Sequence, residues 1–306
     1  MTKLDESKNI IFEDYEEDEI VSYEQWKTIV EIVNIKGTQK RCQKTVKEEI
    51  TCTKRELVKD FQSQIGPFRQ HCTNIRNQHN VISKMKEDLK ETEVIFHFAF
   101  SENYNCKYAN EIQSAHFGGS KKQISLHTTV VYTKIGDNRV AQSYCTLSED
   151  LRHDPKAICA HLKPVIQDVK SSVKHLQSVH FISNGPVTQY RNKSMFQLWV
   201  KDIAKQLEAE EMTWNYTEAG HGKGAPDGVG GSAKRLFDNF VARGFDVPNL
   251  EKLRMLLNDQ ESSTKFFVVN EVDIVIIINA KCSFFVLLCH NFGAHCSIVG
   301  FFPISQ

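Results

Sequence analysis

The sequence predicts an α/β protein in which a mixed sheet is flanked by helices. Three strand patterns follow one another from residue 94, and helix and strand patterns then alternate as far as residue 242. Such an order gives a sheet with both antiparallel and parallel pairs. Of the 306 residues, 41% are hydrophobic, which is enough for a sizeable core and excludes a wholly disordered or collagen-like chain.

Charge is unevenly distributed along the chain, although 38 basic and 38 acidic residues leave no formal net charge. Residues 1–21 are acidic and lack the apolar segment of a signal peptide, so we expect a disordered tail. Residues 22–92 are basic. Nine scattered cysteines without a CxxC pair favour reduced thiols. We therefore expect a nuclear or cytoplasmic protein that is not secreted.

The basic region, residues 22–92, is predicted to be helical. Pro67 is placed to open a helix that continues to about residue 90. That helix contains His71, Cys72 and His79, but the second close ligand pair that a zinc site needs is missing. An earlier helix is indicated by four apolar side chains at helical spacing: Trp26, Ile29, Val30 and Val33.

The central block, residues 93–246, supplies the sheet. A turn signal at Gly136 indicates that the second and third strands form a hairpin. Residues 247–275 predict one more helix and strand. The predicted strands are 94–100, 123–133, 139–147, 178–183 and 212–217, and the predicted helices are 155–169, 195–207 and 228–242.

Three motifs carry unusual chemistry: SENYNCKYANEIQ after the first strand, SNGPVTQYRNK after the fourth, and HGKGAPDGVGG before the last helix. Together they resemble a family of transposon-derived animal proteins that are similar to DDE-type transposases. The resemblance covers roughly residues 20–275. It implies a ribonuclease H-like core with the element order β-β-β-α-β-α-β-α, preceded by the helical region. On that fold, catalytic residues lie on the first strand, just beyond the fourth strand and on the last helix.

Cutting and joining by such enzymes requires divalent metals held by carboxylates, because Mg²⁺ prefers oxygen ligands. The resemblance implies aspartates at positions 99, 184 and 227. This chain has Ala99 and Asn184 at the first two positions and keeps only Asp227, the implied metal ligand. Alanine offers no ligand atom, and the asparagine amide has no charge. We therefore expect a degenerate site that needs Mg²⁺ or Mn²⁺ only if some activity remains.

The resemblance thus favours a catalytically inactive, transposase-derived DNA-binding protein. One alternative is an active Mg²⁺-dependent recombinase or nuclease in which Glu102, three residues beyond Ala99, replaces the missing aspartate. Another is a non-functional remnant or a protein-interaction scaffold. These alternatives differ in whether the chain cleaves DNA, only binds it, or does neither.

DNA is the expected partner, through contacts to its backbone, and no small-molecule substrate is expected. The glycines of HGKGAPDGVGG suit either close approach to a phosphate or tight packing of a helix on the sheet. Trp199 and Trp214 are expected in the core rather than stacked on bases. The candidate phosphate-binding side chains are Lys121, Lys122, Arg191, Lys193, His221, Lys223, Lys234 and Arg235.

The apolar tail, residues 276–306, has several interpretations. Residues 282–302 carry no formal charge and are long enough to cross a bilayer as a helix. Asn291, Gly293 and two histidines weaken that pattern, so we do not expect membrane association. One or two extra strands, or a tail foreign to the domain, are the alternatives.

Overall fold

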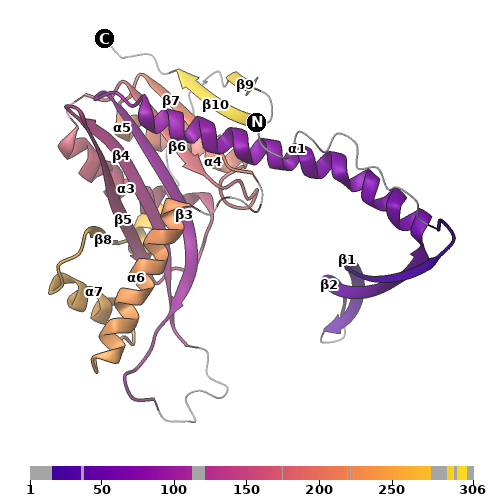
Figure 1. The fold of residues 1–306 in the computed structure, drawn as a ribbon. Coiled ribbons are helices and arrows are strands. Elements are labelled where there is room, and N and C mark those ends of the chain that lie inside the picture. Colours follow the sequence, from indigo (N-terminus) through magenta and orange to yellow (C-terminus); the bar gives the residue numbers. More distant parts are fainter. Residues whose placement is uncertain are drawn as a thin grey trace. The chain divides into compact units, whose positions relative to one another are not determined.

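The computed structural model describes residues 16–35, 38–111, 121–173, 175–218, 220, 222, 224–276, 288–292 and 295–301. The chain divides into two compact units, residues 1–73 and residues 74–306. The first unit holds a β-hairpin and the beginning of a long helix, and the second holds a large sheet with its helices (Figure 1).

The hairpin consists of β1 (Ile20–Ile35) and β2 (Thr38–Thr53), which pair antiparallel along their whole length. Helix α1 (Lys54–Glu87) follows directly. Thr53 and Glu56 begin it as a capping box, because the Thr53 N–H donates to the Glu56 carboxylate at 3.0 Å and the Glu56 N–H donates to the Thr53 hydroxyl at 3.3 Å. None of the side chains described between residues 16 and 73 is buried.

The predicted helical region at residues 22–92 is therefore wrong in its first half. Residues 22–33 belong to a strand, because the same apolar spacing lies in a run dense in β-branched side chains, which prefer strands. Pro67 does not open a helix but lies inside α1. Since β1 starts at Ile20, the expected acidic tail of residues 1–21 overlaps the hairpin, and its residues 1–15 lie outside the described part.

The second unit is built on a mixed sheet, as predicted. Its first strand, β3 (Glu93–Asn105), runs antiparallel to β4 (Gln123–Ile135) and parallel to β6 (Ser178–Ser183). Beyond these, β5 (Asn138–Ser148) pairs antiparallel with β4, and β7 (Glu211–Tyr216) pairs parallel with β6. The described strands follow the order β8-β5-β4-β3-β6-β7-β10-β9.

The outer strands come from the end of the chain. After α7 (Leu250–Asn258), β8 (Thr264–Val268) joins β5, which confirms the expected helix and strand. Helix α8 (Glu271–Ile276) follows. In the apolar tail, the described residues form β9 (Leu288–Phe292) and β10 (His295–Phe301), and β10 pairs with β7. None of the helices among the described residues has the length and apolar character needed to cross a membrane.

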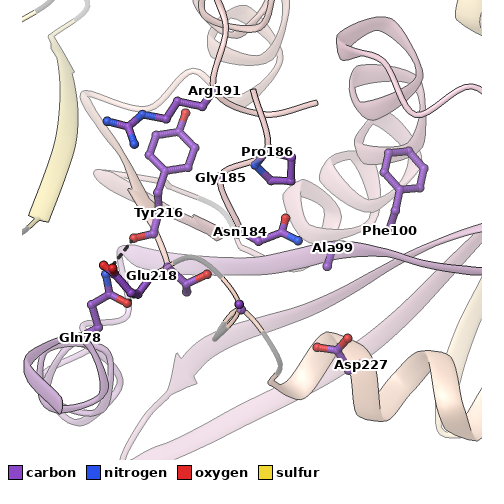
Figure 2. A pocket seen from close by; sticks show the side chains of 13 residues that line it. Gln78, Ala99, Phe100, Asn184, Gly185, Pro186, Arg191, Tyr216, Glu218 and Asp227 are labelled. Carbon is purple, nitrogen blue, oxygen red and sulfur yellow. Dashed lines mark hydrogen bonds between the residues drawn. The ribbon is translucent and has the colours of Figure 1, made fainter. Parts of the chain in front are cut away.

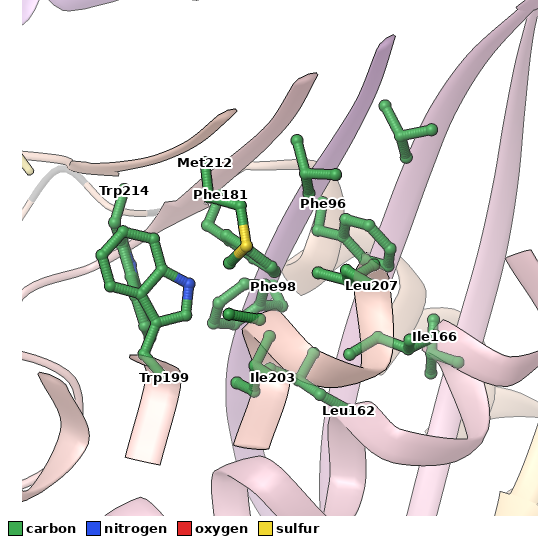
Figure 3. Close-up of a cluster of buried hydrophobic side chains, with 14 of the residues drawn as sticks. Phe96, Phe98, Leu162, Ile166, Phe181, Trp199, Ile203, Leu207, Met212 and Trp214 are labelled. Atoms are coloured by element: carbon green, nitrogen blue, oxygen red, sulfur yellow. The ribbon is translucent and has the colours of Figure 1, made fainter. Parts of the chain in front are cut away.

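One face of the sheet is covered by α3 (Pro155–Ser172) and by a continuous helical stretch of three parts. Those parts are α4 (Lys193–Leu198), the π-helical turn η2 (Trp199–Ile203) and α5 (Ala204–Leu207). Figure 3 shows this core, which contains Trp199 and Trp214. The centroids of their rings lie 5.5 Å apart. Both tryptophans are fully buried, as expected.

The opposite face is covered by α6 (Ala225–Ala242). The centroids of the Phe237 ring of α6 and the Tyr104 ring lie 5.2 Å apart. Side chains alternate between the faces of a strand. On β3, Phe96 and Phe98 therefore enter the α3 side, while Ala99 shares the α6 side with Ser101. This alternation turns position 99 toward the start of α6.

Candidate functional site

A pocket of about 630 Å³ lies where β3, the ends of β6 and β7, and the start of α6 meet (Figure 2). Its lining includes all three positions at which the resemblance implies aspartates: Ala99, Asn184 and Asp227. These residues are far apart in the sequence: Ala99 lies on β3, Asn184 directly follows β6, and Asp227 lies in α6. The pocket also contains Arg191 and Glu218.

Ala99 and Asn184 form the neutral part of the site. Ala99 is 7% exposed, and the Thr128 hydroxyl donates to its carbonyl at 3.1 Å, which fixes the backbone of β3 at this point. Asn184 follows the last residue of β6. Its Oδ1 atom is buried and has no hydrogen-bond partner among the described residues. Position 99 therefore contributes a methyl group, and position 184 contributes an amide oxygen.

Asp227 is the acidic part of the site, and it also has a structural role. It lies in the first turn of α6, where its Oδ2 atom accepts the N–H of Gly224 at 2.8 Å. A carboxylate in a first turn satisfies free N–H groups and interacts favourably with the helix dipole. Asp227 thus stabilises α6 while its side chain lines the pocket.

The donors in the pocket do not fit a pair of divalent metals. Two-metal sites need several carboxylates to offset the charge of the cations. The three implied positions supply only one carboxylate, that of Asp227. Glu218 is the second carboxylate of the lining, but its Oε2 atom accepts from Asn74 Nδ2 at 3.4 Å. Among the described residues, no group of three or more His, Cys, Asp and Glu side chains is arranged to hold a metal ion.

Glu102, the possible substitute in the alternative of an active enzyme, is not among the residues that line this pocket. Its side chain is 97% exposed, and its carboxylate lies 3.7 Å from Lys234 Nζ on α6. The strand is irregular here, with a register shift between Ser101 and Tyr104. Glu111, in contrast, braces its own loop by accepting the Tyr108 N–H at 3.2 Å.

The expected phosphate-binding residues do not form a single surface. Arg191 lines the pocket, with its guanidinium 5.8 Å from the Tyr216 ring centre, and Lys193 is exposed at the start of α4. Lys121 and Lys122 line a different pocket, of about 640 Å³. Lys121 also pairs with the carboxylate of Glu111 at 2.8 Å.

Two further cations lie along α6. Lys234 approaches Glu102, and Arg235 donates to the Ser232 hydroxyl at 3.1 Å. The last two candidates, His221 and Lys223, fall outside the described residues. Of the candidates that the structure describes, Arg191 is therefore the one placed in the pocket with Asp227.

Three glycines of the glycine-rich segment are required by close packing. A Cβ atom on Gly222 would lie 2.8 Å from Asn184 Cβ, and one on Gly224 would lie 2.9 Å from His97 Cε1. On Gly230 it would lie 2.5 Å from Ser101 Oγ. The packing interpretation therefore accounts for these glycines without a ligand, and a role in phosphate binding stays a prediction.

Gln78 is a residue beside the site that no sequence pattern indicates. Gln78 of α1 is buried, its Nε2 donates to the Tyr216 carbonyl at 3.3 Å, and its Oε1 accepts the Glu218 N–H at 2.7 Å. Gln78 therefore holds the end of β7. No pattern indicates it, because a single glutamine in a polar helix is unremarkable. Tyr190, whose hydroxyl accepts the Phe100 N–H at 3.1 Å, does lie in the QYRNK motif.

His97 is a further buried polar group next to the glycine segment. It is 7% exposed, and its Nδ1 atom has no partner within the described part of the chain. Burial, together with the charge of Lys86, lowers the pKa of His97 to about 4. The imidazole is therefore neutral at physiological pH.

Comparison with known proteins places the second unit in a family. No curated protein and no solved structure matches the chain. Residues 78–279, well over half of the sequence, match a family described as a domain of unknown function, DUF8701. The matched segment begins at Gln78 and includes Ala99, Asn184 and Asp227. The chain therefore belongs to the DUF8701 family.

Proposed function

We propose that this chain is a transposase-derived DNA-binding protein whose ribonuclease H-like core has lost its metal site and no longer cuts or joins DNA. The observation that carries the proposal is that one pocket is lined by Ala99, Asn184 and Asp227. The motif resemblance implies aspartates at these three positions, although nothing in their spacing requires them to meet. Their meeting supports a common origin for the three motifs.

The order of elements also supports the proposal. Three antiparallel strands, β3 to β5, are followed by α3, β6, a helical stretch, β7 and α6. The three positions lie on the first strand of this series, just beyond the fourth and at the start of the last helix. This agrees with where the resemblance expects a catalytic site.

Loss of catalysis follows from the charges in the pocket. Coulombic attraction between a dication and a carboxylate is the main source of metal affinity at such a site. With a methyl group at position 99 and an amide at position 184, only Asp227 remains of the three charges. The proposed activity is therefore DNA binding without cleavage, with Arg191 as the candidate phosphate contact in the pocket.

DNA binding is tested with the full chain and a fluorescently labelled duplex, by anisotropy at several salt concentrations. We expect binding that weakens with salt, because phosphate contacts release counterions. Arg191→Ala with Lys193→Ala should lower the affinity. Arg254→Ala is the matched control, since Arg254 on α7 is exposed and pairs locally with Glu251. A dissociation constant weaker than about 10⁻⁴ M at physiological salt would favour the scaffold alternative.

Cleavage is tested by strand nicking with Mg²⁺ or Mn²⁺. The natural chain should be silent, and Ala99→Asp with Asn184→Asp should introduce nicking. Adding Asp227→Asn to that double variant should abolish nicking again. Nicking by the natural chain would show that the site is not degenerate and would direct attention to Glu218 and Glu102. Silence of the double variant in the presence of normal DNA binding would remove the support for a former metal site.

A further inference from the structure

Strand β1 is apolar on both of its faces, although nothing in the described structure covers it. On one face, Trp26 is 68% exposed, Val30 is 59% exposed and Ile32 is 61% exposed. On the other face, Ile29 is 41% exposed and Val33 is 37% exposed. Strands that are apolar on both faces are typical of the interior of a sheet, where each face is covered. β1, however, has only one partner strand among the described residues.

Strand β2 has the character of an outer strand. It is rich in exposed cations, of which Lys40 and Lys44 lie on one face and Arg41 and Lys47 on the other. Lysines along an edge strand prevent another chain from pairing with it. The hairpin thus has a protected edge at β2 and an open edge at β1.

The hairpin also lacks the means to stabilise itself. No described side chain from residue 16 to residue 73 is buried, and an isolated two-stranded hairpin is at best marginally stable in water. A third strand beside β1 would pair with the backbone groups along its open edge and place further side chains beside its exposed apolar residues.

We propose that this third strand is β1 of a second copy of the chain. The two copies pair antiparallel about a two-fold axis and form a four-stranded sheet in the order β2-β1-β1-β2. The same surface serves both copies, which is the commonest symmetry of protein dimers. Both cation-rich strands then lie at the outer edges.

The charges of β1 select one register for this pairing. With the axis at Ile29, Lys27 lies opposite Glu31 of the second copy, and Glu31 lies opposite its Lys27. The same register places Trp26 opposite Ile32. Opposite charges and aromatic–aliphatic pairs that face each other across neighbouring strands are both favourable. Moving the axis by one residue, to Thr28 or Val30, removes the pairing of Lys27 with Glu31.

Within its own hairpin, Lys27 already forms an ion pair with a residue of β2. Its Nζ atom lies 2.8 Å from the Glu48 carboxylate of its own hairpin. In the dimer, Lys27 therefore lies between two carboxylates. Glu31 is exposed in the single chain, and the pairing places a cation opposite its carboxylate.

The mass of the full chain in solution tests the proposal, by size-exclusion chromatography with light scattering over a dilution series. We expect a mass of about twice 35.1 kDa at high concentration. Glu31→Lys places like charges opposite each other and should shift the equilibrium to the monomer. Combining it with Lys27→Glu exchanges the two charges and should restore the dimer. Glu49→Lys, an exposed charge reversal on β2, is the matched control and should leave the dimer intact.

Two results would overturn the proposal. One is a monomer at every concentration, which would mean that a different partner covers β1. The other is a dimer that persists in Glu31→Lys and also in Val30→Lys with Ile32→Lys, since its interface would then lie elsewhere. Circular dichroism of each variant checks that the fold is kept, because all the changed side chains are exposed in the single chain. Neither outcome depends on whether the chain binds DNA.

Discussion

The N–H of Gly224 donates to the carboxylate of Asp227 at 2.8 Å, so the aspartate that lines the pocket also caps the helix that carries it. Asp227 therefore has a structural role that does not depend on catalysis. The side chains of Ala99 and Asn184 have no comparable role. The contact at Ala99 is made by its backbone, and the side-chain oxygen of Asn184 has no partner among the described residues.

Asp227→Ala should consequently lower the stability of the protein. Loss of a capping side chain costs about 0.5–2 kcal/mol of unfolding free energy. Urea denaturation measures the change. Glu261→Ala is a suitable control, because Glu261 is an exposed carboxylate outside any described helix. An unchanged midpoint for Asp227→Ala would mean that the contact with Gly224 contributes nothing to the fold.

Two glycines of α6 should respond in opposite directions to alanine. A Cβ atom on Gly230 would lie 2.5 Å from Ser101 Oγ, whereas one on Gly228 meets nothing within 4 Å. Gly228→Ala should stabilise the protein by up to about 1 kcal/mol, through helix propensity. Gly230→Ala should destabilise it by about 1–3 kcal/mol, because overpacking outweighs that gain.

Thermal or urea unfolding of both variants tests this pair. Equal stabilisation by the two alanines would show that α6 can move away from β3 at little cost. If both alanines destabilised the protein equally, Gly228 would have a structural role that its open surroundings do not explain.

Stability should fall as the pH decreases below about 6.5, because buried histidines are held neutral in the folded state. Burial lowers the pKa of His161 to about 3, and burial together with Lys86 lowers that of His97 to about 4. The pKa of His127 is also lowered, by its complete burial and by the nearby His161 and His153. The unfolded chain binds protons on these groups before the folded chain does. Their contribution is complete above the unfolded pKa and is lost as the pH falls toward the folded value.

His127→Phe should make this pH dependence shallower. Neither ring nitrogen of His127 has a hydrogen-bond partner in the described structure, and its ring lies 4.7 Å from that of Phe100. A phenyl ring should therefore be accepted without loss of stability at pH 7.5. The measurement is the difference in unfolding free energy between pH 7.5 and pH 5, for the natural chain and the variant. A difference that the substitution leaves unchanged would contradict the assignment to His127.

The sheet was predictable because its strands have clear local patterns. The segment around Phe96 is compact and aromatic, and the two strands that flank Gly136 alternate and carry β-branched residues. The hairpin at the front was missed because the spacing of Trp26, Ile29 and Val33 follows the helical period, whereas the apolar residues of the strand are spread over both of its faces. Pairing with β2 decided between helix and strand, and pairing is not a local property.

In the candidate site, too, the residues with a local sequence pattern were predicted and those without one were missed. Ala99, Asn184 and Asp227 were found because each lies in or beside a motif. Gln78 and Glu218 were missed because their contact joins residues 140 positions apart and has no local pattern. The motifs thus predicted which positions meet, but not what holds them in place.

The close packing around Asn184 means that a negative charge would be accommodated differently at position 184 and at position 99. Gly222 leaves no room to spare beside Asn184 Cβ, yet aspartate and asparagine have the same outline. Asn184→Asp therefore introduces a charge without moving the loop. At Ala99, a carboxylate must instead take its space from the pocket itself. Both positions are uncharged, but only Asn184 has the shape of an aspartate.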